Sequence, residues 1–124
     1  MNGTVARTLA GIGVALATAL VLLGLAVAAF FNPWFVAFEQ GRSDAAAFTG
    51  YSPDELRAAT DGILGDLYLG SGDFGVAVHG QPVLDERERA HMRDVRGVFA
   101  GFWLTVLVAA AALVLARART CGAA

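Results

Sequence analysis

The sequence is poor in charge, contains no lysine and has a single cysteine, Cys121. One cysteine excludes an internal disulfide framework and any site built from several cysteine ligands. The chain has no basic patch and no segment in which arginines alternate with aromatic residues, which excludes the usual nucleic-acid-binding surfaces. Charged residues make up 16% of the 124 residues, against about 25% in an average soluble domain. A single soluble globule is therefore excluded.

The shortage of charge is confined to two parts of the chain. Of the 20 charged residues, 17 lie between Glu39 and Arg96, and none lies in the runs 8–38 and 97–116. A helix needs about 20 consecutive apolar residues to cross a bilayer, and both runs supply them. The sequence therefore predicts an α-helical integral membrane protein, a two-span helical hairpin with a mostly helical loop of roughly 60 residues. The expected segments are an end at 1–7, a first span at 8–31, a loop at 32–96, a second span at 97–116 and a tail at 117–124.

The first apolar run has a second interpretation, as a cleaved signal peptide. Ala26-Val27-Ala28 resembles a cleavage site behind a start that carries Arg7. The run is, however, longer than the apolar core of about 7–15 residues that signal peptides use, and it continues into Phe30 and Phe31. These features favour an uncleaved anchor.

Several features of the spans bear on their surroundings. Trp34 follows the first span and Trp103 begins the second, as expected for an aromatic belt on the loop side. Arginines flank the second span on both sides, so their count leaves the orientation open. Gly11-Ile12-Gly13 and Ala110-Ala111-Ala112 offer small-residue faces, through which spans of two copies could pair.

The loop contains clear signals for where helices begin and end. Asn32-Pro33 ends the first helix, and Ser52, Pro53 and Glu55 form a capping box with proline at the first helical position. The helix near 53–69 has one apolar face and ends at Gly70; the face comprises Leu56, Ala59, Ile63, Leu64 and Leu67.

The second half of the loop leads into the second span. Phe74, Val76 and Val78 alternate with small residues, as in a short strand, and Gly80-Gln81-Pro82 is typical of a turn. Asp85 and Glu88 form a second capping box. We therefore expect one long helix from about residue 86 to residue 116, whose first turns lie outside the hydrocarbon.

The residues most able to carry chemistry lie in those first turns. Glu88, His91 and Asp94 are spaced by three, so both carboxylates lie near the helix face that carries His91. A neighbouring carboxylate orients an imidazole and raises its basicity, as a general base requires. His91 precedes Gly97 by six residues, which is about 9 Å of helix and places it at the level of lipid headgroups.

Less specific interpretations of the same residues remain open. A charge-dense helical turn is commonly a solvated face, and arginines such as Arg87 and Arg93 bind phosphate without any catalysis. The Glu88/His91 pair has the spacing of a carboxylate-bridged metal site, but the only other histidine is His79, so we expect neither a metal nor a cofactor. Tyr51 is a candidate auxiliary acid or base, although packing is the more usual role of such a residue.

The segment Leu84 to Arg96, with His91-Met92-Arg93-Asp94-Val95 at its centre, resembles a family of small bacterial integral membrane proteins that includes the lipoprotein intramolecular transacylase (Lit). Supporting similarities are Trp34-Phe35-Val36-Ala37-Phe38, the Tyr51–Leu56 segment, Leu67-Tyr68-Leu69 and Phe74. The resemblance covers about residues 14–102.

The resemblance implies a membrane acyltransferase of the bacterial plasma membrane. The loop would be extracytoplasmic and both chain ends cytoplasmic. An acyl chain would move from the glycerol of a lipoprotein to the amine of its N-terminal cysteine. His91 would act as the base, Glu88 or Asp94 would orient it, and an arginine such as Arg87 would bind phosphate or an oxyanion.

The transacylases of that family have four spans, and a second loop contributes a further histidine. This chain matches only their first half, so we expect a truncated form, a split form that needs a partner half, or a degraded remnant. Partners implied are membrane lipid, a bacterial lipoprotein, a second copy or a separate C-terminal half. The alternative is a non-catalytic membrane module whose loop binds a protein or lipid headgroups.

Overall fold

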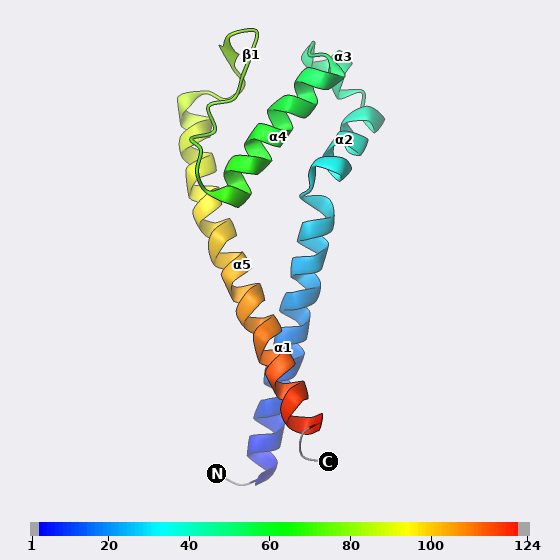
Figure 1. The fold of residues 1–124 in the computed structure, drawn as a ribbon, viewed down its shortest axis with the longest axis vertical. Coiled ribbons are helices and arrows are strands. Elements are labelled where there is room, and N and C mark those ends of the chain that lie inside the picture. Colours follow the sequence, from blue (N-terminus) through cyan, green and yellow to red (C-terminus); the bar gives the residue numbers. More distant parts are fainter. Residues whose placement is uncertain (1–2, 122–124) are drawn as a thin grey trace. The chain divides into compact units, whose positions relative to one another are not determined.

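The computed structural model describes residues 3–121, which are mostly helical (Figure 1). Its elements in chain order are α1 (Gly3–Phe30), α2 (Pro33–Arg42), α3 (Ala45–Thr49), α4 (Pro53–Leu69), β1 (Ala77–Val78), β2 (Gln81–Pro82) and α5 (Glu86–Cys121). The chain divides into two compact units. One comprises residues up to Val27 together with those from Gly101 onward, and the other comprises Ala28–Ala100.

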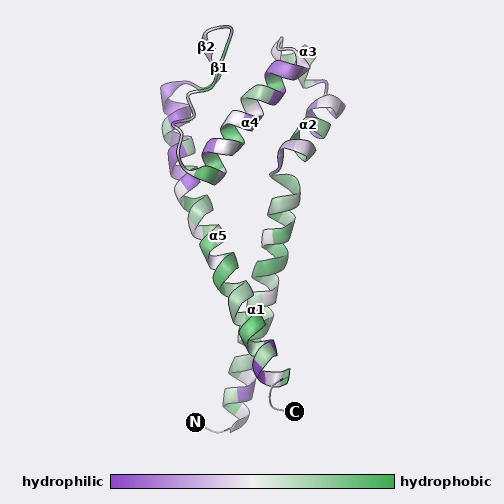
Figure 2. Cartoon of the chain, in the orientation of Figure 1, coloured by the Kyte–Doolittle hydropathy of each residue, from purple (hydrophilic) through white to green (hydrophobic). Residues whose placement is uncertain are grey.

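Two helices are long and apolar enough to cross a membrane. α1 has 28 residues and α5 has 36, and each contains an 18-residue stretch with a mean hydropathy of 2.5. Only 6% of that stretch in α1 and 11% in α5 is buried, whereas the core helix of a soluble protein is mostly buried. Figure 2 shows the apolar colouring along most of α1 and the middle of α5, in contrast to the hydrophilic first and last turns of α5. Exposed apolar surface of this extent favours a lipid environment.

The first unit is held by close contact between α1 and α5 at a glycine. Gly24, Val106 and Ala109 are its buried residues. A Cβ atom on Gly24 would lie 2.7 Å from Cγ1 of Val106, so the missing side chain allows the close approach. Gly11 and Gly13, in one of the expected small-residue faces, have no neighbour within 4 Å of such a Cβ among the described residues.

The second unit begins with a corner at Asn32. The Asn32 side chain accepts a hydrogen bond from the Phe35 N–H at 2.9 Å and donates to the carbonyl of Ala29 at 2.6 Å. The Asn32 side chain therefore provides hydrogen-bond partners for a backbone carbonyl at the end of α1 and for a backbone N–H at the start of α2. The end of the first helix was expected here, but α2 and α3 were not predicted from the sequence.

The helix α4 supplies most of the core of the second unit. Both hydrogen bonds of the predicted Ser52/Glu55 capping box are formed, and Gly70 ends the helix with a φ of 68°. From the expected apolar face, Ala59, Leu64 and Leu67 are buried. Gln40 of α2 donates a hydrogen bond to the Thr60 hydroxyl at 2.8 Å, which ties α2 to α4.

The strand and turn after α4 differ from the prediction. β1 pairs with β2 as a two-residue antiparallel ladder, with Ala77 opposite Pro82 and Val78 opposite Gln81. The turn therefore lies at His79 and Gly80, whose φ values of 52° and 76° suit a tight hairpin. Of the expected turn Gly80-Gln81-Pro82, only Gly80 lies in the turn, and Gln81 and Pro82 form β2 instead. Proline is tolerated there because β2 is an edge strand.

The long helix α5 begins where the second capping box predicts. The Glu88 N–H donates to the Asp85 carboxylate and the Asp85 N–H donates to the Glu88 carboxylate, both at 2.8 Å. The helix continues to Cys121, beyond the expected end at residue 116. α1 likewise begins at Gly3, within the expected N-terminal end. Residues 1–2 and 122–124 of the two expected end segments lie outside the described residues.

The Gly24–Val106 contact predicts a position-specific effect of added bulk. Gly24→Val should lower the free energy of unfolding by about 1–3 kcal/mol, because the new side chain overlaps Val106. Gly13→Val, at a glycine with open space, is the matched control, and Val106→Ala should restore stability to the Gly24→Val protein. Denaturant unfolding in detergent micelles measures all three, and equal stability of the two glycine variants would contradict the packing.

Candidate functional site

The first turns of α5 divide their charged residues between two faces. A helix makes one turn every 3.6 residues, so residues three, four and seven apart share a face. Arg89, Arg93 and Arg96 form one such stripe, which we call the arginine face. Arg87, His91 and Asp94 form the other, which we call the histidine face. The two stripes lie on opposite sides of the helix.

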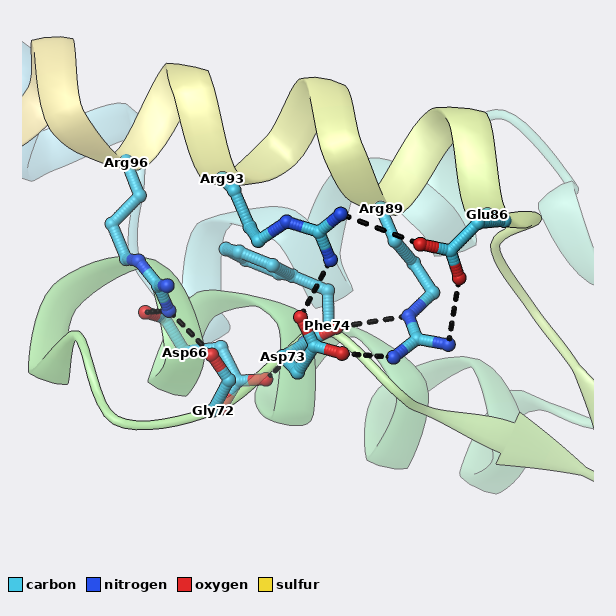
Figure 3. A network of polar contacts seen from close by, with 8 residues as sticks. All are labelled: Asp66, Gly72, Asp73, Phe74, Glu86, Arg89, Arg93 and Arg96. Atoms are coloured by element: carbon cyan, nitrogen blue, oxygen red, sulfur yellow. Dashed lines mark hydrogen bonds and ion pairs between the residues drawn. The ribbon is translucent and has the colours of Figure 1, made fainter.

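The arginine face binds the carboxylate of Asp73, which lies between α4 and β1. Arg93 donates to one Asp73 oxygen at 2.7 Å, and Arg89 forms an ion pair with the other (Figure 3). The Arg89 Nε also donates to the Asp73 carbonyl at 3.0 Å. Glu86 completes the cluster, with ion pairs of 3.6 Å to Arg89 and 3.4 Å to Arg93.

Phe74 is the hydrophobic anchor of this arrangement. Its side chain is fully buried, and the Arg96 guanidinium lies 5.1 Å from its ring centroid. Arg96 also donates to the Gly72 carbonyl at 2.5 Å, and the Phe74 N–H donates to the Asp66 carboxylate at 2.7 Å. Phe74 has a φ of 54°, an unfavourable conformation for a bulky residue. These contacts keep it there.

The charge cluster shifts the pKa of two of its members, Asp73 and Arg93. The hydrogen bond from Arg93, reinforced by the charge of Arg89, holds the pKa of Asp73 below its ordinary value. The reciprocal effect raises the pKa of Arg93, through hydrogen bonds to Asp73 and then to Glu86. The Asp73 carboxylate and the Arg93 guanidinium are therefore both charged at neutral pH.

The histidine face is open. His91 is exposed and lines a shallow hollow of about 370 Å³ together with Leu84, Arg87, Glu88 and Met92. Among residues 3–121, neither His91 nor Arg87 takes part in a side-chain hydrogen bond or ion pair. An exposed imidazole with a guanidinium one helical turn away can accept a proton and can bind an anion.

The two carboxylates predicted to orient His91 have different surroundings. Glu88 lies at the hollow, but one of its carboxylate oxygens accepts the Asp85 N–H and is used in the helix cap. Asp94 is exposed, on the same face as His91. In the part of the chain that the structure describes, neither is hydrogen-bonded to His91.

The remaining predicted site residues do not join His91. Arg93, a candidate phosphate or oxyanion contact, is bound to Asp73 and Glu86 on the other face. Tyr51 is half-buried just before α4, and over residues 3–121 it makes no contact with His91. His79 forms an ion pair of 2.5 Å with Glu55. Hydrogen bonds from Ser52, its backbone N–H first, and the charge of His79 lower the pKa of Glu55.

No group of three or more histidine, cysteine, aspartate or glutamate side chains among residues 3–121 could hold a metal ion. Within the charge cluster of the arginine face, Asp73 was not singled out from the sequence, and Phe74 was expected in a short strand rather than as a buried anchor. The helical spacing of Arg89, Arg93 and Arg96 marks one charged face but does not identify the carboxylate that this face binds.

Burial of Phe74 predicts a large loss of stability on truncation. Phe74→Ala should lower the free energy of unfolding by about 3–5 kcal/mol, because it removes a fully buried ring. Phe48 is 92% exposed, so Phe48→Ala should change stability by less than about 0.5 kcal/mol. Thermal unfolding in detergent, followed by circular dichroism, compares the two, and similar midpoints would contradict the anchor.

The lowered pKa of Asp73 predicts an acid-sensitive loop. A carboxylate whose pKa is lower in the folded state stabilises that state above its unfolded pKa, about 3.9 for aspartate. This contribution disappears as the pH falls through the lower folded value. Backbone amides of 70–76 should therefore exchange faster with solvent as the pH drops below about 3.9, relative to the rate expected at each pH.

In Asp73→Asn the same amides should exchange faster already at neutral pH, and the excess should change little on acidification. Asp61→Asn, on the exposed side of α4, is the control. Equal protection of 70–76 in Asp73→Asn and the unchanged protein would contradict the role of the carboxylate.

Comparison of the chain with known protein-family models, curated proteins and solved structures gave no match. The similarity to the transacylase family therefore rests on the residues quoted above. The contacts of α5 supply the independent basis for assigning roles to its two faces.

Proposed function

We propose that the chain is a two-span protein of the bacterial plasma membrane whose histidine face contributes to acyl transfer on lipoproteins. The observation that carries the proposal is the open position of His91. The arginines of the opposite face are occupied by Asp73, Glu86 and Gly72, whereas His91 and Arg87 are exposed beside a hollow. If His91 and Arg87 served only to stabilise the fold, we would expect them to contact other residues of the chain, as the arginines of the opposite face do.

The position of His91 along α5 suits a lipid substrate. It lies six residues before Gly97, where the uncharged part of the helix begins. At 1.5 Å per residue this is about 9 Å, the depth of headgroups and glycerol esters. In the proposed orientation the loop is extracytoplasmic and both chain ends are cytoplasmic, as the resemblance implies.

In the proposed reaction, the N-terminal amine of a lipoprotein attacks a carbonyl carbon of its own glycerol ester. His91 removes a proton from the attacking nitrogen as the carbon–nitrogen bond forms, and Arg87 stabilises the tetrahedral oxyanion. The ester carbon–oxygen bond then breaks, and the proton passes to the departing glycerol oxygen. The products are an amide at the cysteine nitrogen and a free glycerol hydroxyl.

The positions of the carboxylates refine the assignment of roles. Glu88 is engaged in the helix cap, so we assign the orientation of His91 to Asp94, three residues further along the same face. Phosphate or oxyanion binding falls to Arg87 rather than Arg93. The remaining groups would come from a partner half or a second copy.

The absence of a carboxylate bonded to His91 among the described residues favours a second candidate function. In that alternative the histidine face is a non-catalytic surface that binds lipid headgroups, with Arg87 as the phosphate ligand. The two functions differ in whether replacing His91 changes the covalent state of a lipoprotein.

The test is mass spectrometry of lipoprotein N-termini from bacteria that produce the chain. His91→Ala should reduce the N-acylated lyso-form by about 10²–10⁴-fold, the usual contribution of a general base. His79→Ala, which changes the histidine paired with Glu55, should leave the product unchanged. If membrane-inserted His91→Ala protein gives full product, the acyl-transfer proposal fails. If the unchanged chain yields no product even with a co-produced partner half, the headgroup-binding alternative stands.

A further inference from the structure

One face of α2 carries two aromatic side chains that are half or more exposed in the part of the chain that the structure describes. Trp34 is 76% exposed and Phe38 is 51% exposed, although both are large and apolar. Their rings stack with centroids 6.2 Å apart, and the Arg42 guanidinium lies 5.9 Å from the Phe38 centroid. These three residues are four apart and so form one stripe, which we call the aromatic face of α2.

The opposite side of α2 packs on the rest of the second unit. Val36 and Gln40 lie on that side and are partly buried, and Gln40 is hydrogen-bonded to Thr60 of α4. The orientation of α2 about its own axis is therefore set by α4. The aromatic face therefore points away from α4.

The chain itself indicates what covers this face. Only two residues separate the end of α1 at Phe30 from the start of α2 at Pro33. The Asn32 cap and the edge-to-face contact of Phe30 with Phe35 fix this corner. α1 is long and apolar enough to cross a membrane and is exposed along its length. The aromatic face thus starts where a span reaches the headgroups, the region that tryptophan prefers.

We infer that α2 is an interfacial helix, whose aromatic face inserts Trp34 and Phe38 into the boundary between headgroups and acyl chains. An amphipathic helix in this position lies with its apolar side about 5–10 Å into the boundary. The Arg42 guanidinium lies over the Phe38 ring and within 3.8 Å of the Glu39 carboxylate, at the edge of this face, where it would meet the phosphates. The inference rests on the membrane insertion in the proposed function but not on acyl transfer.

Tryptophan fluorescence tests the inference because the chain has only two tryptophans. Trp103→Phe leaves Trp34 as the sole reporter, and Trp34→Phe leaves Trp103, near the start of the second span. Each full-length variant is reconstituted into phosphatidylcholine vesicles that contain brominated phosphatidylcholine. Aqueous iodide is the opposing quencher. A variant with both replacements and Asp61→Trp, on the exposed side of α4, provides a water-exposed reference.

Trp34 should be quenched by lipid brominated near the carbonyl end of the acyl chain more than by lipid brominated near the methyl end. It should also be shielded from iodide relative to the tryptophan introduced at position 61. Quenching of Trp34 by iodide but not by bromolipid, while Trp103 is quenched by bromolipid, would overturn the inference and leave the spans intact. Shielding of Trp34 from both quenchers would show a protein neighbour and would also overturn it. Failure of bromolipid to quench Trp103 would refute the membrane proposal itself.

Discussion

The second unit depends on one carboxylate, that of Asp73, shared between Arg89 and Arg93 of α5. The ion pairs are partly exposed, and such pairs individually contribute little to stability. Their effect here is geometric, because the next residue is the fully buried Phe74, which adopts an unfavourable left-handed backbone conformation. The carboxylate and the Arg96 hydrogen bond to Gly72 hold the backbone on either side of that ring.

Because three of its arginines bind other residues of the chain, the charged segment of α5 has only its opposite side open to a ligand. Arginines close to a membrane are commonly phosphate ligands, yet three of those in the first turns of α5 contact residues of this chain. The residues left open are on the opposite side, around His91 and Arg87. Because the arginine face is bound to the rest of the second unit, the helix cannot turn about its own axis, and the histidine face keeps a fixed direction. A general base acting on a lipid ester requires such a fixed orientation.

Signals that act over a few residues were readable from the sequence. Both capping boxes and the glycine stop after α4 follow from local hydrogen bonding. α2 was missed because no apolar period marks it, although Asn32 caps it and Pro33 stands in its first turn. α3 was missed because it is only five residues long and has no side-chain cap. The turn was misplaced because Pro82 was taken as a turn residue, whereas it lies on an edge strand.

The contacts of Asp73 with Arg89 and Arg93 join residues 16 and 20 positions apart in the sequence. The spacing of the arginines within α5 gave no indication that Asp73 is their partner. The relationship to the transacylase family and the role of His91 stay predictions.

The central claim is that α5 has one face of immobilised arginines and one open face. Nuclear magnetic resonance of ¹⁵N-arginine protein in detergent micelles or nanodiscs tests it without altering any residue, since hindered rotation of a guanidinium separates the signals of its two terminal nitrogens. Arg89, Arg93 and Arg96 bind their partners through terminal nitrogens and should show distinct terminal nitrogen signals, whereas Arg87 should show averaged signals. Averaged terminal nitrogen signals at Arg93, as at Arg87, would contradict the division of the helix into two faces.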